Sequence, residues 1–235
     1  MLCELNWKNI YYFSKQTFHL MGRKITPEDL QNGDEFIFLT EVSHLRLKEF
    51  VIQQIRVENK LIKAYSAYQI AMIVILISTI IKAFILNSRG IGRPLQDVGL
   101  AFVFSFSVLV VLHELIHAVA YWLSGSRNLI FGALWKRFLF YVLADKQVVS
   151  PTVFRFVANA PLVFVKVVTL VFVIFFWQTP TAYFFMTIMC LHSLFCAGDM
   201  AMLAFYRIHP DKEIYNYDDV EKKMTYFYYR KKNAR

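Results

Sequence analysis

The chain has 235 residues, of which 57% are hydrophobic and 17% aromatic, and its formal net charge is +9. This composition is too apolar for an ordinary soluble domain and indicates an integral membrane protein. Because the basic residues flank apolar runs, the positive charge predicts membrane orientation and argues against a nucleic-acid partner.

Residues 1–63 mix polar, basic and aromatic positions and predict a small N-terminal region in the cytosol or on the membrane surface. The segment from Thr26 to Asp29 predicts a helix start, because it offers a threonine cap, a proline at the first position and acids in the first turn. From Thr40 to Lys63 apolar residues recur at helical spacing, which predicts an amphipathic helix.

Four long apolar segments predict four transmembrane helices, at residues 64–86, 98–123, 152–177 and 180–205. Between the second and third, residues 128–152 hold short aromatic and β-branched runs broken by turn residues, which predicts a β-hairpin. A free strand edge on that hairpin could hold an extended peptide. The expected fold is an all-α membrane protein with about four spans and one hairpin. The expected division is residues 1–63, a transmembrane core at 64–206 and a basic cytosolic tail at 207–235.

The distribution of lysine and arginine predicts the orientation. Nine lie in residues 1–63, five in 124–155 and eight in 207–235, against two in the loop 87–97. With four spans, this places both termini and the hairpin in the cytoplasm of a multi-pass protein of the cell membrane.

Two imidazoles and a carboxylate stand in the otherwise apolar second span, as His113, Glu114 and His117. Histidines four residues apart share one helix face, so both can reach a single Zn²⁺. Glu114 lies about 100° round the helix, beside the metal, where it could accept a proton from water. An ionisable group at membrane depth costs at least ~2.5 kcal/mol, so the three need a compensating partner. Hydrogen bonding between packed helices, or an ion path, is the alternative interpretation.

A zinc site with two histidines needs a third protein ligand at the same depth. Counted from the cytoplasmic ends of their spans, His117, Asn159 and Asp199 all lie roughly 10 Å below the interface at 1.5 Å per residue. Asp199 is the candidate ligand, and the small residues Ala197 and Gly198 beside it are expected to let the fourth helix approach the second. His192 is an alternative ligand or a partner of a ligand, and Asp199 could instead serve helix packing.

Three motifs together resemble the putative zincin peptidases, a family of small bacterial membrane proteins that is similar to the site-2 intramembrane metalloproteases. They are His113-Glu114-Leu115-Ile116-His117, Ala158-Asn159-Ala160-Pro161-Leu162 and Ala197-Gly198-Asp199-Met200. The resemblance covers about residues 98–205 and implies a zinc-dependent peptidase. It assigns His113, His117 and Asp199 as ligands and Glu114 as general base. Site-2 proteases usually carry the aspartate in an Asp-Gly order, whereas here Gly198 precedes Asp199.

The sequence thus favours a membrane-embedded zinc peptidase acting on a membrane protein or peptide. Asn159 could donate a hydrogen bond to the oxyanion, or could bridge helices. A non-catalytic metal-binding scaffold remains open, and so does an ion-coupled transporter, for which Lys166 in the third span would be the main indication.

Overall fold

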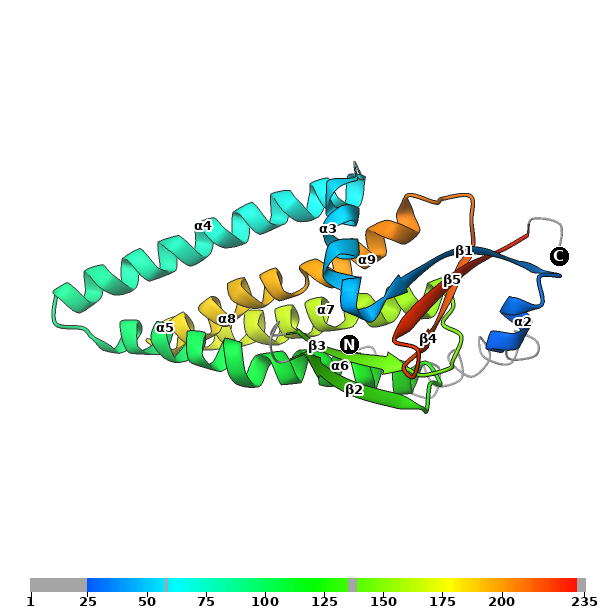
Figure 1. The fold of residues 1–235 in the computed structure, drawn as a ribbon. Helices are drawn as coiled ribbons and strands as arrows, with labels where there is room; N and C mark the ends of the chain where they lie inside the picture. The colour runs from blue at the N-terminus through cyan, green and yellow to red at the C-terminus, as the bar shows by residue number, and fades with distance from the viewer. Residues whose placement is uncertain (1–24, 58, 135–138, 232–235) are drawn as a thin grey trace, which may run out of the picture.

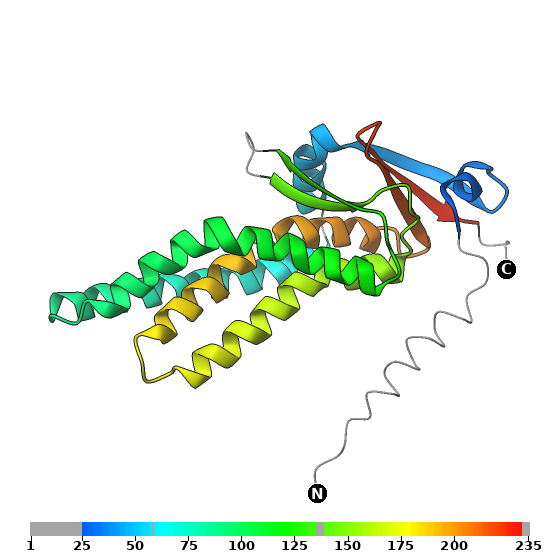
Figure 2. The ribbon, with the colours of Figure 1, turned by 90° about the horizontal axis from the view of Figure 1, so that it is seen from below.

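The computed structural model describes residues 25–57, 59–134 and 139–231. Its long helices run roughly along one axis, α3 (Leu47–Arg56) stands across them, and its strands gather toward one end (Figure 1). Seen from below, the hairpin and a second, three-stranded sheet lie over the same end of the bundle (Figure 2). The fold is therefore mostly helical, as expected, but all-α is corrected, because the three-stranded sheet was not predicted.

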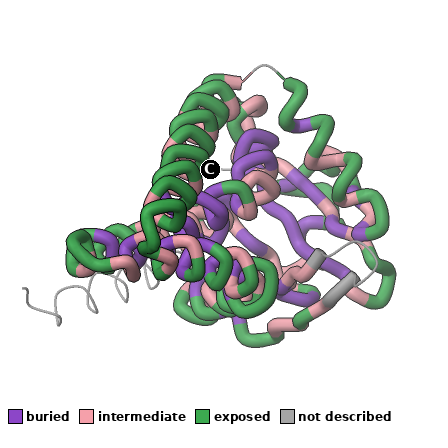
Figure 3. Tube along the Cα trace, turned by 90° about the vertical axis from the view of Figure 1, so that its left-hand side faces the viewer, coloured by how far each residue is buried: buried purple, intermediate pink, exposed green. Residues whose placement is uncertain are grey.

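Among the described residues, three helices are long and apolar enough to cross a membrane, and a bent pair of helices makes a fourth span if it counts as one. They are α4 (Lys60–Ser88), the continuous helix Arg93–Leu123 and α7 (Pro151–Phe175), and the bent pair is α8 (Thr181–Phe195) with α9 (Ala197–Arg207). Their outer faces are exposed and apolar around a buried interior (Figure 3), as lipid-facing surfaces are. The predicted fourth span, residues 180–205, corresponds to the pair α8 and α9, which meet at a bend of 42°.

Side chains at the helix starts explain where the helices begin. The side chain of Asn59 accepts from the Leu61 amide before α4, and that of Ser150 accepts from the Val153 amide before α7. The predicted start at Thr26 is confirmed, because Thr26 and Asp29 form a reciprocal capping box at α2 (Pro27–Gln31).

The second span contains an interruption one turn before the histidines. It consists of α5 (Arg93–Phe104), the π-helical turn η2 (Ser105–Leu109) and α6 (Val110–Leu123). A π turn inserts an extra residue into the helical repeat and so rotates everything after it relative to the start of the helix. The turn therefore sets which face of α6 carries the histidines.

The predicted hairpin is confirmed. Strands β2 (Leu129–Leu134) and β3 (Leu139–Ala144) pair antiparallel, from Leu129 opposite Ala144 to Leu134 opposite Leu139. Val142 and Ala144 of β3 pack against Ala118 and Tyr121 of α6, so the hairpin lies directly on the helix that carries the histidines.

The second sheet joins the two ends of the described chain. Strand β1 (Phe36–Ser43) pairs with β5 (Met224–Arg230), which also pairs with β4 (Ile214–Asp219), in the order β1-β5-β4. The helix expected from Thr40 is therefore wrong over its first part. The chain leaves β1 through the short helix η1 (His44–Arg46) and forms α3 (Leu47–Arg56), and α4 begins at Lys60.

Hydrogen bonds tie this sheet to the base of the hairpin and to α9. The amides of Lys146 and Val149 donate to the carbonyls of Asp218 and Asn216 in β4, at 2.8 and 2.7 Å. The Tyr206 hydroxyl of α9 donates to the Asn216 side-chain oxygen at 2.7 Å. The sheet thus fixes α9 relative to the hairpin, and through the hairpin relative to α6.

Candidate metal centre

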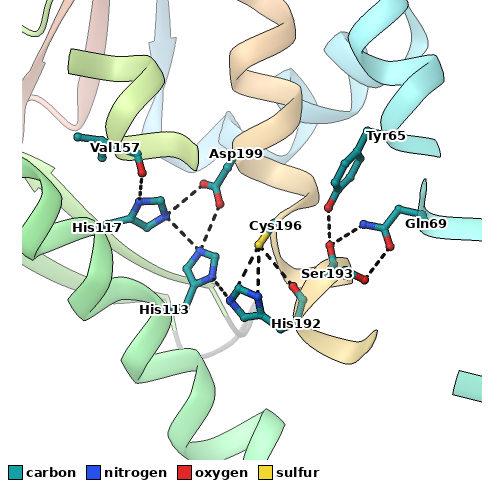
Figure 4. Close-up of polar contacts among 9 residues, drawn as sticks. All are labelled: Tyr65, Gln69, His113, His117, Val157, His192, Ser193, Cys196 and Asp199. Carbon is teal, nitrogen blue, oxygen red and sulfur yellow. Dashed lines mark hydrogen bonds and ion pairs between the residues drawn. The ribbon is translucent and has the colours of Figure 1, made fainter. Parts of the chain in front are cut away.

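Three ligand-capable side chains converge inside the bundle (Figure 4). His113 and His117 lie one turn apart on α6 and are both buried, and their Nε2 atoms are 3.1 Å apart. Asp199 enters from the first turn of α9, with Oδ2 3.3 Å from His113 Nε2 and Oδ1 3.3 Å from His117 Nε2. The structure therefore brings together the three residues named as ligands from the sequence.

These distances fit a tetrahedral metal ion. Zinc bonds of about 2.0–2.1 Å at tetrahedral angles place neighbouring ligand atoms about 3.3 Å apart. The two histidine nitrogens are 3.1 Å apart and each has a different Asp199 oxygen at 3.3 Å, so all three spacings lie close to that value. The donor set of two imidazole nitrogens and one carboxylate also suits zinc. The residues present thus fit the metal that the resemblance implies.

The outer nitrogen of each histidine has a partner on a different helix. His117 Nδ1 lies 3.0 Å from the backbone carbonyl oxygen of Val157 in α7. His113 Nδ1 lies 3.1 Å from His192 Nε2 in α8. Partners of this kind hold a ligand ring in one orientation and one tautomer. Helices α7, α8 and α9 therefore all contribute to the orientation of the two imidazole rings on α6.

His192 lies behind His113 rather than beside Asp199. It is fully buried and contacts the nitrogen of His113 that points away from the carboxylate (Figure 4). On its other side, the Cys196 sulfur is 3.7 Å from His192 Nδ1. His113, His192 and Cys196 thus form a second group of ligand-capable atoms that shares His113 with the first.

The bend between α8 and α9 sets the position of Asp199, three residues after Cys196. Just before the bend, the Ser193 carbonyl accepts hydrogen bonds from the Tyr65 hydroxyl and, at 2.6 Å, from the Gln69 side chain, both on α4. The expectation that Gly198 permits close helix contact is wrong, because a β-carbon there would meet nothing within 4 Å. The bend, rather than a small-residue contact, brings Asp199 to the histidines.

Glu114 is half-buried on the side of α6 that faces the hairpin, and it interacts with the backbone amide of Val142 in β3. Its carboxylate is therefore next to the ligand His113 in sequence but directed to the strand.

The other two sequence candidates are engaged elsewhere. The Asn159 amide nitrogen donates to the Arg155 carbonyl of its own helix at 2.7 Å. Lys166 Nζ donates to the Met189 carbonyl of α8 at 2.8 Å and lies over the Tyr68 ring, 5.1 Å from its centre. The structure thus gives Lys166 a role between helices, and it does not bring Asn159 into contact with the ligands.

Sequence reasoning did not find the Val157 carbonyl, because a backbone acceptor leaves no side-chain motif. A signal was nevertheless present, since Pro161 stands four residues after Val157 and cannot donate to it. Tyr65 and Gln69 were not predicted to take part, because nothing in the apolar segment that contains them indicates which carbonyl they contact.

A family comparison agrees with this geometry. Residues 106–214 match the family described as Putative zincin peptidase. The resemblance predicted from the motifs is thereby confirmed for these residues. The matched region contains His113, His117 and Asp199, the hairpin and the bent pair α8 and α9, and it ends where β4 begins. No curated protein and no solved structure matches the chain.

Proposed function

We propose that this protein is a membrane-embedded zinc metallopeptidase that hydrolyses peptide bonds of membrane or membrane-associated substrates near the cytoplasmic face. The convergence of His113, His117 and Asp199 at metal-ligand spacing carries the proposal. The match to a zincin peptidase family supports the same reaction class. The similarity to site-2 proteases, and the position in the cell membrane with both termini cytoplasmic, are parts of this proposal.

The two histidines and the aspartate would hold the metal on three sides and leave one position facing the substrate. When bound, zinc supplies Lewis-acid chemistry, polarising the scissile carbonyl and making water acidic near neutral pH. Glu114 acts as the general base: it accepts a proton from the attacking water and returns it to the leaving amine. The carboxylate is suited to this role because it is not itself among the three converging ligands.

The hairpin offers a way to hold an extended substrate. The Asp145 amide donates to the Asn128 carbonyl, so residues 145 and 143 face β2 and Val142 faces the opposite edge of β3. The Val142 amide is also the group beside Glu114. A peptide added as a strand along this edge would run past the general base, and its backbone would supply most of the binding. The substrate class is therefore an extended or locally unwound peptide rather than a helix.

Glu114→Gln tests catalysis directly. We expect the purified variant to keep its zinc and to lose peptide cleavage, because the amide preserves shape but cannot accept the proton. Glu221→Gln is the matched control, since Glu221 is an exposed carboxylate paired with Lys146 and distant in sequence from the ligands. If Glu114→Gln cleaved a substrate at the rate of the unmodified protein, the mechanism would be wrong. A protein that holds one zinc but cleaves nothing would instead be a non-catalytic metal-binding scaffold.

A further inference from the structure

Pro161 interrupts the backbone hydrogen bonding of α7 four residues after Val157. In a regular α-helix, the carbonyl of residue 157 accepts the N–H of residue 161. Proline has no N–H, so this carbonyl loses its usual donor although α7 continues to Phe175. Val157 is only 3% exposed, and a carbonyl without a donor inside a bilayer costs several kcal/mol. Another donor must therefore replace the missing one.

His117 provides that donor. Its Nδ1 is 3.0 Å from the Val157 carbonyl oxygen (Figure 4). A carbonyl can only accept, so the proton of a neutral His117 ring must be on Nδ1. The lone pair is then on Nε2, the atom 3.1 Å from His113 Nε2 and 3.3 Å from Asp199 Oδ1. The contact thus selects the tautomer and points its lone pair to the centre of the ligand group.

We propose that Pro161 is a positioning residue for the metal centre, which acts by leaving the Val157 carbonyl free to orient His117. The inference rests on the proposed zinc site. It assigns the proline of the Ala158–Leu162 segment a chemical role, through one backbone carbonyl of its own helix that contacts His117 of α6. Pro161 itself is fully buried and touches no ligand in the geometry above.

Replacing the proline by alanine tests the role, because Pro161→Ala supplies the missing N–H and improves helix propensity. The new N–H competes with His117 for the Val157 carbonyl. We expect a ten- to hundredfold loss of zinc affinity in the full-length, detergent-purified protein, the range for losing a partner of a metal ligand. Zinc affinity is measured by competition with a chelator. In NMR of ¹⁵N-histidine-labelled protein, the Nδ1–H proton of His117 should show the downfield shift of a hydrogen-bonded group in the unmodified chain and should lose that shift in the variant.

A second variant separates the freed carbonyl from packing by the proline ring. Pro161→lactic acid, an α-hydroxy acid introduced by nonsense suppression, has the side chain of alanine but an ester oxygen in place of the N–H. It should keep zinc affinity within about threefold of the unmodified protein, because the Val157 carbonyl stays free. Pro180→Ala, at the N-cap of α8, is the control for removing a proline that leaves no carbonyl free inside a helix, and it should also retain affinity.

The results separate this inference from the proposed function. If the unmodified chain binds zinc and Pro161→Ala binds it equally well, the positioning role is wrong and the zinc site stands. If the lactic acid variant loses as much affinity as Pro161→Ala, the ring rather than the missing N–H is responsible, and the inference is again overturned. An unmodified chain that holds no zinc overturns both. Selective loss of affinity in Pro161→Ala, together with loss of the His117 Nδ1–H hydrogen bond, supports both.

Discussion

Removal of the Asp199 carboxylate is the most direct perturbation of the metal centre. Its two oxygens lie 3.3 Å from the two histidine Nε2 atoms, so Asp199→Ala leaves a site with two neutral ligands. Structural zinc sites bind with roughly 10–16 kcal/mol over four ligands, or about 2.5–4 kcal/mol per ligand. That corresponds to a loss of about 70- to 900-fold in affinity. Because Asp199 is the one charged ligand of the three, we expect the upper end of this range.

His192→Ala is the matched comparison, because His192 contacts a ligand without joining the converging group. Its loss should cost about ten- to hundredfold in affinity. Zinc content is measured after dialysis of the detergent-purified proteins against a graded series of chelators, and thermal unfolding checks that both variants fold. Asp199→Asn keeps the size of the side chain and isolates the effect of charge. Should His192→Ala come out metal-free while Asp199→Ala retains stoichiometric zinc, Asp199 would be a packing residue, and the site would instead use His113, His192 and Cys196.

Two further predictions concern the membrane and the hairpin. Reporter fusions at Asn87 or Gln178 should read as outside the cell and a fusion at Ser126 as cytoplasmic, and a cytoplasmic signal at Gln178 would overturn the four-span topology. Gly132→Ala should destabilise the protein by about 1–3 kcal/mol in denaturant unfolding, because the new β-carbon would lie 2.2–2.5 Å from two ring carbons and the hydroxyl oxygen of Tyr141. Adding Tyr141→Ala should remove that additional cost, and a penalty that persists in the double variant would contradict the clash.

The histidine pair could be predicted because its information is local. Residues four apart on a helix share a face whatever the rest of the fold does. Asp199 could be predicted from its depth, because it lies about as many residues from the cytoplasmic end of its predicted span as His117 does from the end of its own. That argument needs only the helical rise and the orientation of the spans, so it held even though α8 and α9 turned out to be bent. Depth along the membrane normal is insensitive to a moderate bend.

The three-stranded sheet could not be predicted in the same way. β1 pairs with β5, whose residues lie almost two hundred positions later in the chain, and β5 also pairs with β4. The spacing of apolar residues within a short segment does not indicate which distant strand the segment will pair with. The apolar positions of Val42, Leu45 and Leu47 fit a helical spacing, although Val42 belongs to a strand and Leu47 begins α3. The boundary between the two is set by pairing with β5, which is a tertiary effect.

The bend at Cys196 also left no clear signal, because the residues around it are apolar or small and suit a continuous span. What stabilises the bend comes from α4. The Ser193 carbonyl belongs to the last turn of α8, where carbonyls lose their donors within the helix, and Tyr65 and Gln69 supply replacements. A sequence shows that α4 has polar positions, but only the packed helices show what they contact.

Three interruptions in the helices have one feature in common: each lies next to a group of the candidate metal centre. The π turn ends directly before α6, Pro161 frees the carbonyl that contacts His117, and the bend precedes Asp199. In a bilayer, a backbone group released from a helix must find a partner within the protein, since neither water nor lipid supplies one. A helix that is interrupted near polar side chains therefore stabilises them and is stabilised by them. The polar side chains of this site would cost free energy to bury without partners. The three departures from regular helix supply such partners, which gives a reason for their position around the site.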